Sequence, residues 1–139
     1  MKRFTIISGL LLALAAGIAA AAEEGWVEKR AVATVGSDGV QRMEITGGDF
    51  YFDPNVIVVK VNVPVELTVK KVRGIVPHDF TLKAPEAGID VAVKLSSDPQ
   101  VVKFTPTKTG SYAFECTKKP WFFKSHKDRG MHGTLEVVE

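Results

Sequence analysis

Short segments rich in β-branched and aromatic residues recur about every ten residues along most of this 139-residue chain, with Gly, Pro, Asp or Asn between them. This spacing restricts the fold more than any other feature, because it leaves little room for long helices. The pattern predicts an all-β fold, an antiparallel Greek-key β-sandwich or barrel. The expected strands are residues 31–35, 40–45, 56–61, 65–72, 79–83, 91–95, 101–104, 111–115 and 133–138.

The joins between these segments carry turn-forming residues. Gly36–Gly39 lies between the first two segments and predicts a hairpin. No segment beyond residue 22 shows sustained helical periodicity, so only short helices are expected, at residues 85–88 or within 117–130.

The N-terminus has the composition of a secretory signal. Lys2 and Arg3 precede a long apolar run, and a string of alanines ending at Ala22 precedes an acidic pair. This order is typical of a Sec-type signal peptide. The alternative is a membrane anchor kept in the mature protein, but the run is short for a span of about 20 residues. We expect a cleaved signal peptide at residues 1–22, one domain at residues 23–139, and a periplasmic protein with no permanent membrane anchor.

The expected mature chain is small and electrically neutral. Removal of 22 of the 139 residues leaves 117, enough for one hydrophobic core without a disulfide. Because Lys2 and Arg3 leave with the signal, 16 basic residues face 16 acidic ones, and no nucleic-acid partner is expected. Cys116 is the only cysteine. A lone thiol in an exported protein is expected to be buried or bound to a metal.

One short C-terminal stretch gathers several metal-binding side chains. Cys116, His126 and Met131 lie within it, and His78 lies upstream at the start of an expected strand. The ends of such strands meet at one pole of a Greek-key sandwich, so the four side chains can converge. One thiolate, two imidazoles and one thioether form the donor set of a mononuclear electron-transfer copper site.

Each donor also has an ordinary structural explanation. Cys116 can be a buried structural thiol, His78 an exposed turn histidine and Met131 a core methionine. Glu115 or a backbone carbonyl can also contribute to a metal site here.

The second histidine is a choice between His126 and His132. His132 follows Met131 directly and starts the last expected strand, so its side chain should point away from the face of Met131. This favours His126.

Four segments, taken together, resemble the cupredoxins, the family of small blue-copper proteins. Ile45–Val59 resembles the opening of that family, and Pro77–Phe80 resembles its first-ligand segment. Gly110–Cys116 resembles its cysteine strand, and His126–Leu135 resembles its C-terminal ligand segment. The resemblance implies a cupredoxin fold that binds one copper ion, with His78, Cys116 and His126 as equatorial ligands and Met131 as axial ligand.

The chain departs from the family pattern in one loop. Nine residues, Thr117 to Ser125, separate Cys116 from His126, whereas the family usually has two to four. The longer loop either bulges outward and leaves the ligands in place, or lets His126 shift and bring Met131 closer. Our hypothesis is a mononuclear site with some tetragonal distortion.

The same loop contains Trp121, Phe122 and Phe123. We expect two of the three rings to be buried within the loop and one to be exposed beside His126, where an apolar patch lets a redox partner dock closely. From Glu115 to Met131 the chain also carries five basic and two acidic side chains. Solvated lysines are the ordinary explanation, and steering toward an acidic partner surface is the functional one.

The resemblance implies a periplasmic electron carrier that acts as a monomer and passes single electrons between redox proteins docking near His126. The alternative is a copper-tolerance protein that binds or sequesters the metal. An enzyme is not expected, because four ligands leave no open position for a substrate.

Overall fold

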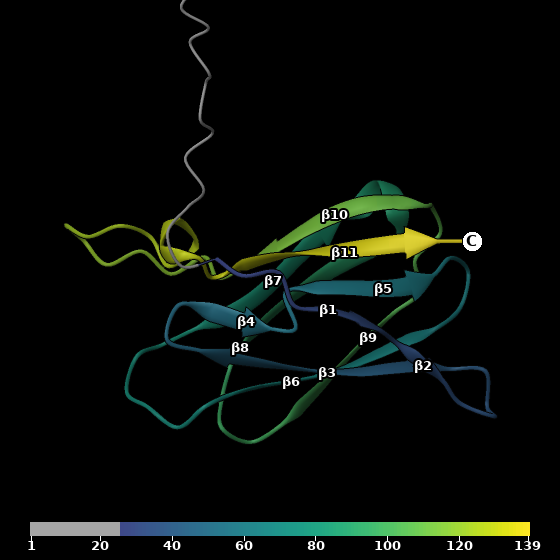
Figure 1. Cartoon of the computed structure of the whole chain (residues 1–139), viewed down its shortest axis with the longest axis horizontal. Helices are drawn as coiled ribbons and strands as arrows, with labels where there is room; N and C mark the ends of the chain where they lie inside the picture. Colours follow the sequence, from purple (N-terminus) through teal and green to yellow (C-terminus); the bar gives the residue numbers. More distant parts are fainter. Residues whose placement is uncertain (1–25) are drawn as a thin grey trace, which may run out of the picture.

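Strands dominate residues 26–139, the part of the chain that the computed structural model describes (Figure 1). The predicted signal peptide, residues 1–22, lies outside these described residues. Two 3₁₀-helices, η1 (Pro85–Ala87) and η2 (Lys127–Arg129), lie where short helices were expected. The strands are β1 (Arg30–Val32), β2 (Thr34–Val35), β3 (Gln41–Gly48), β4 (Tyr51–Asp53), β5 (Val56–Lys60), β6 (Val65–Lys71), β7 (Asp79–Ala84), β8 (Ile89–Lys94), β9 (Gln100–Phe104), β10 (Gly110–Glu115) and β11 (His132–Val138).

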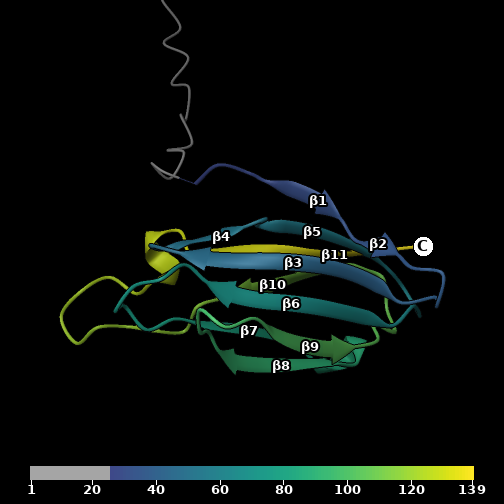
Figure 2. The same ribbon diagram turned by 90° about the horizontal axis from the view of Figure 1, so that it is seen from below.

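The strands form two sheets that pack face to face (Figures 1 and 2). One sheet has the order β1-β5-β11-β10-β7-β8, and the other has the order β2-β3-β6-β9 with β4 paired to β3. The predicted all-β Greek-key sandwich is therefore confirmed. The expectation of purely antiparallel strands is wrong, because β1–β5, β5–β11 and β3–β6 pair in parallel. Alternation of apolar and polar residues identifies a strand but does not specify its neighbour. Here the chain crosses from one sheet to the other between strands, so some neighbouring strands run in the same direction.

The first predicted strand is two strands. Ala33 separates β1 from β2 and donates its N–H to the carbonyl of Val58 at 2.9 Å. The chain switches sheets at this point, since β1 pairs with β5 and β2 pairs with β3. The strand β4, which follows β3 after a two-residue turn, was not predicted from the sequence.

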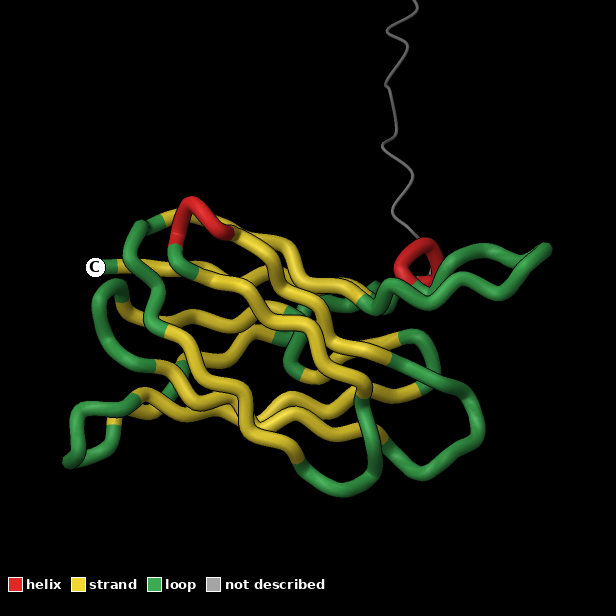
Figure 3. Tube along the Cα trace, turned by 180° about the vertical axis from the view of Figure 1, so that it is seen from behind, coloured by secondary structure: helices red, strands yellow, loops and turns green. Residues whose placement is uncertain are grey.

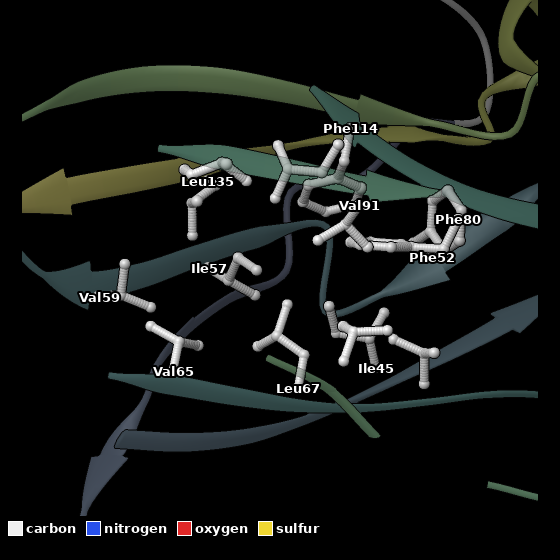
Figure 4. Packing of buried hydrophobic residues seen from close by; sticks show 14 of the residues in the cluster. Ile45, Phe52, Ile57, Val59, Val65, Leu67, Phe80, Val91, Phe114 and Leu135 are labelled. Carbon is white, nitrogen blue, oxygen red and sulfur yellow. The ribbon is translucent and has the colours of Figure 1, made fainter. Parts of the chain in front are cut away.

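The core fills the space between the sheets (Figure 4). Its aromatic centre is a trio in which Phe52 contacts Phe80 and Phe114 with ring centroids 5.7 and 5.4 Å apart. Aliphatic side chains from both sheets continue the core along the strands: Ile45, Ile57, Leu67, Leu82 and Leu135. Such burial is the main stabilising contribution to a fold of this size, and it gives the ends of the strands fixed positions.

Several loops gather at the end of the sandwich opposite the C-terminus. The longest, residues 116–131, projects beyond the strand ends, with η2 at its base (Figures 1 and 3). The β6–β7 loop lies at the same end (Figures 1 and 2). Within residues 26–139, none of the helices has the length and apolar character needed to cross a membrane.

Candidate metal centre

Cys116 directly follows β10 and is fully buried. Its backbone N–H donates to the carbonyl of Met131 at 3.0 Å, which extends the β10–β11 ladder by one more pair. Its Sγ accepts the backbone N–H of Asp79 at 3.4 Å. The thiol therefore has a position set by three strands, β7, β10 and β11.

His126 lies at the other end of the inserted loop. Its backbone N–H donates to the carbonyl of Lys118 at 2.9 Å, so the loop closes at its base. Its carbonyl accepts the N–H of Arg129 at 3.2 Å and the N–H of Met131 at 3.0 Å. Residues 119–125 consequently project outward from the closed base of the loop, and these backbone hydrogen bonds hold His126 in place.

His78 immediately precedes β7, and its carbonyl accepts the N–H of Leu95 at 3.0 Å. The loop before it is braced by Lys71, whose Nζ donates to the carbonyls of Gly74 and Val76 at 2.9 and 2.8 Å. His78 is only 2% exposed, so it is not a solvent-exposed turn histidine.

The three side chains converge in one buried cluster. Sγ of Cys116 lies 3.9 Å from Nδ1 of His78 and 3.5 Å from Nδ1 of His126, and the two Nδ1 atoms are 3.2 Å apart. Within residues 26–139, His78, Cys116 and His126 form a group that could hold a metal ion. Each offers one ligand atom, and these atoms all lie within 4.8 Å of one another.

Met131 and His132 are adjacent in the sequence but have different surroundings. Met131 is fully buried and is joined through its backbone to Cys116 and His126. Its methyl carbon lies 3.2 Å from the position a Cβ on Gly47 would take, so a side chain at residue 47 would crowd it. His132 is outside the cluster and stacks on Trp26, with ring centroids 5.7 Å apart and planes at 4°.

Burial sets the protonation of the cluster in the metal-free protein. Burial lowers the pKa of His78, and the neighbouring His126 lowers it further. Burial likewise lowers the pKa of His126, with Arg129 acting in the same direction. Burial raises the pKa of the Cys116 thiol, although the backbone amides of Asp79 and Lys118 oppose this effect. The site therefore prefers neutral imidazoles and, without a cation, a neutral thiol.

Three further residues, which are not among the predicted site residues, support the cluster. The Phe50 ring lies edge-on to His126 and His78, with centroids 4.9 and 6.1 Å apart, and the Arg129 guanidinium lies 3.8 Å from its centre. Asp79 accepts the backbone N–H and the hydroxyl of Thr117, both at 2.6 Å. Asp79 follows His78 directly, and this adjacency is the one sequence signal that points to it.

Glu115, the alternative ligand, interacts with a lysine. Its carboxylate forms an ion pair with Lys127. The expectation for the loop rings is wrong, because Trp121, Phe122 and Phe123 are all exposed.

A groove runs beside His126. Its volume is about 450 Å³, and its walls come from the β6–β7 loop and the base of the inserted loop. The lining is mainly apolar, with two lysines among its residues: Ile75, Val76, Pro77, Lys118, Lys119, Pro120 and His126.

The donor set fits copper. Ligands about 2.0–2.3 Å from one ion in a trigonal plane lie about 3.5–4 Å from one another. The separations of 3.2, 3.5 and 3.9 Å between the three donor atoms are close to that geometry. Two imidazoles and one thiolate, with a thioether nearby, form the combination that distinguishes mononuclear electron-transfer copper sites from zinc or iron–sulfur sites.

Comparison with solved structures agrees with this fold. The metal-binding domain of the Streptococcus pneumoniae D39 Cu(I)-exporting P-type ATPase CopA, solved with Cu(I), matches with a TM-score of 0.61 and 17% identity, covering 81% of this chain and 99% of that one. A copper-binding protein in the apo form matches with a TM-score of 0.56 and 22% identity over 78% of this chain and 96% of that one. Reduced auracyanin from Roseiflexus castenholzii matches with a TM-score of 0.56 and 20% identity, covering 70% of this chain and 97% of that one.

No protein-family model matches the chain, and no curated protein sequence is significantly similar to it. The structural likenesses confirm the expected cupredoxin fold. At these identities they establish the fold alone, and the assignment of a metal rests on the donor atoms of the cluster.

Proposed function

We propose that this protein binds one copper ion through His78, Cys116 and His126, with Met131 as the weaker fourth ligand, and carries single electrons in the periplasm. The observation that carries the proposal is the convergence of two Nδ1 atoms and one Sγ within 4.8 Å at a buried end of the sandwich. Copper supplies the Cu(I)/Cu(II) redox couple there.

The residues of the chain would keep the site unchanged between the two redox states. Cys116 is held by the β10–β11 ladder and by the N–H of Asp79, and His126 by the closed base of its loop. A rigid ligand set needs little rearrangement when one electron is gained or lost. Because four protein ligands leave no open position, we assign no catalytic role to the centre.

A redox partner would dock at the groove beside His126. The mainly apolar lining permits close approach, and the surrounding lysines favour an acidic partner surface. Electron exchange with such a partner should slow as ionic strength rises, and a rate independent of salt would contradict this steering.

Copper titration with visible and electron paramagnetic resonance spectra tests the centre. We expect Cys116→Ser to abolish the thiolate-to-copper absorption, and His126→Ala to abolish the type 1 signal. His132→Ala is the matched control and should keep both. Loss of the signal in His132→Ala but not in His126→Ala would contradict the ligand assignment. The same spectra test the tetragonal distortion, which a single dominant long-wavelength band would exclude.

Copper tolerance is the second candidate function. The likeness in fold to the metal-binding domain of a Cu(I)-exporting ATPase supports it. A redox titration combined with a Cu(I) affinity measurement separates the two. Reversible redox chemistry with fast self-exchange supports the carrier, whereas sluggish exchange with expression induced by copper supports tolerance.

A further inference from the structure

Three consecutive aromatic side chains form the outer end of the inserted loop. Trp121 is 93% exposed, Phe122 is 89% exposed and Phe123 is 70% exposed. The backbone turns there, as the N–H of Phe123 donates to the carbonyl of Pro120 at 3.1 Å. We call these three residues the aromatic tip. Exposed apolar groups gathered in this way mark an interaction surface on a soluble protein.

The aromatic tip is not needed to hold the candidate centre. The loop closes at its base through His126 and Lys118, before the aromatic tip begins. Within the tip, the rings of Trp121 and Phe122 contact each other, with centroids 6.0 Å apart. Neither ring reaches the core, so the exposed rings are free to contact something outside the molecule.

Lysines surround the aromatic tip. Lys118 and Lys119 precede it, and Lys124 follows it directly. Lys118 lies 3.7 Å from a carboxylate oxygen of Asp79, whereas Lys119 and Lys124 have no ion pair within 4 Å among residues 26–139. Lys119 interacts electrostatically with Asp128 without forming an ion pair within 4 Å, and the two lysines beside exposed rings complement a surface that is both anionic and apolar.

The shape of the loop indicates which surface this is. The inserted loop that carries the aromatic tip projects from the end of the sandwich (Figure 1), while the groove lies nearer the base of the loop, next to His126. A projecting tip fits a deformable surface better than a rigid one. A lipid bilayer is deformable, and Trp and Phe beside Lys are residues typical of the membrane–water interface.

We propose that the aromatic tip inserts into the headgroup region of an anionic lipid bilayer and holds the protein reversibly on a membrane surface. Trp121, Phe122 and Phe123 enter the interface, and Lys119 and Lys124 contact lipid phosphates. The attachment needs no metal, so it stands or falls independently of the proposed copper function.

Metal-free protein, exported and processed by the cell, provides the test. Trp26 and Trp121 are the only tryptophans, so Trp26→Phe makes Trp121 the sole fluorescent reporter. We expect co-sedimentation and a blue shift of Trp121 emission with phosphatidylglycerol–phosphatidylethanolamine vesicles. Pure phosphatidylcholine vesicles should bind less strongly by roughly fivefold for each lysine. Absence of both signals with anionic vesicles would overturn the proposal.

Matched variants locate the contact. Replacing all three residues of the aromatic tip by Ser should weaken vesicle binding by at least about tenfold. The control is Val32→Ser with Val101→Ser, because these valines are 70% and 53% exposed but lie on strands. Equal binding of the tip variant and its parent, or an equal loss in the control, would contradict the proposal. Absence of vesicle binding in every form would overturn the proposal, and slower electron exchange of the copper-loaded tip variant with a soluble acidic redox protein would then show that the tip docks a protein instead.

A variant without the two lysines separates the electrostatic contribution to membrane binding from the contribution of the aromatic rings. Lys119→Gln with Lys124→Gln should weaken binding to anionic vesicles and leave binding to phosphatidylcholine unchanged. An unchanged affinity for anionic vesicles would contradict the role of the lysines. Circular dichroism of each variant, compared with the parent, verifies that the sandwich is folded.

Discussion

The ring of Phe50 packs edge-on against the imidazole of His126, with centroids 4.9 Å apart and planes at 80°. Phe50 has a φ of 63°, a conformation that bulky side chains rarely adopt. The turn between β3 and β4 thus holds a strained residue whose ring limits the tilt of His126. Strain of this kind persists where the surroundings fix it, and it is common at functional sites.

Phe50→Ala and Phe50→Gly form a matched pair for this role. Both remove the ring, so in the copper-loaded protein both should change the intensity ratio of the two thiolate-to-copper bands. Only glycine relieves the backbone, so the metal-free Gly variant should be more stable than the Ala variant by about 1 kcal/mol. Chemical denaturation measures the second effect. Unchanged spectra in both variants would show that the ring does not position His126.

Asp79 joins the two chain segments that carry His78 and Cys116. It accepts two hydrogen bonds from Thr117 at 2.6 Å, and its own N–H reaches Sγ of Cys116. Asp79→Ala should lower the free energy of unfolding by about 3–6 kcal/mol, because it removes two hydrogen bonds to a charged group, each of which contributes about 1.5–3 kcal/mol. Urea denaturation of the metal-free protein measures this.

Thr117→Val is the control for Asp79. It removes only the hydroxyl bond and keeps the backbone bond, so it should cost less than half as much as Asp79→Ala. A double-mutant cycle with the two variants isolates their coupling. Additive effects would mean that the two side chains do not act together.

The convergence of three of the proposed donor residues could be predicted from the sequence, because this combination of side chains is rare. A lone cysteine followed by a histidine and a methionine, with a histidine before another strand, restricts the choices strongly, and the structure brings His78, Cys116 and His126 together. Phe50 was not predictable. Nothing in a phenylalanine indicates a left-handed turn, and its contact with His126 depends on how two distant loops meet.

The strands were largely predictable, but their pairing was not. Alternation identified β6 and β7, whereas β4, three residues long, is too short to produce a pattern. The parallel pairing of β3 with β6 depends on the path between the sheets. The exposure of all three loop rings, rather than one, was also not predicted, because apolar rings are usually buried.

Gly133 is a packing requirement of β11. A Cβ at this position would meet the backbone oxygen of Asn55 and the ring of Phe114, neither of which has room to move. Gly133→Ala should therefore lower the free energy of unfolding by more than about 3 kcal/mol. Gly39→Ala is the comparison, since its Cβ would meet nothing within 4 Å and only its φ of 75° is unfavourable. Equal melting temperatures of the two variants would contradict this account.

The metal-free protein should be most stable over a narrow pH range. The pKa values of His78 and His126 are lowered in the folded state by burial, so the unfolded state binds more protons as pH falls. Stability should therefore decrease as pH drops below the ordinary histidine value of about 6.5. The pKa of Cys116 is raised, so the folded state keeps its proton longer, and stability should also decrease above about pH 8.5.

Thermal unfolding of the metal-free protein from about pH 5 to 9 measures both slopes. Replacing His78 and His126 by Asn should remove most of the acid-side slope, and Cys116→Ser should remove the alkaline one. Val101→Ser, on an exposed strand face, should leave both slopes unchanged. If the acid-side slope survives in the double histidine variant, other groups determine it, and the two imidazoles are not held neutral by burial.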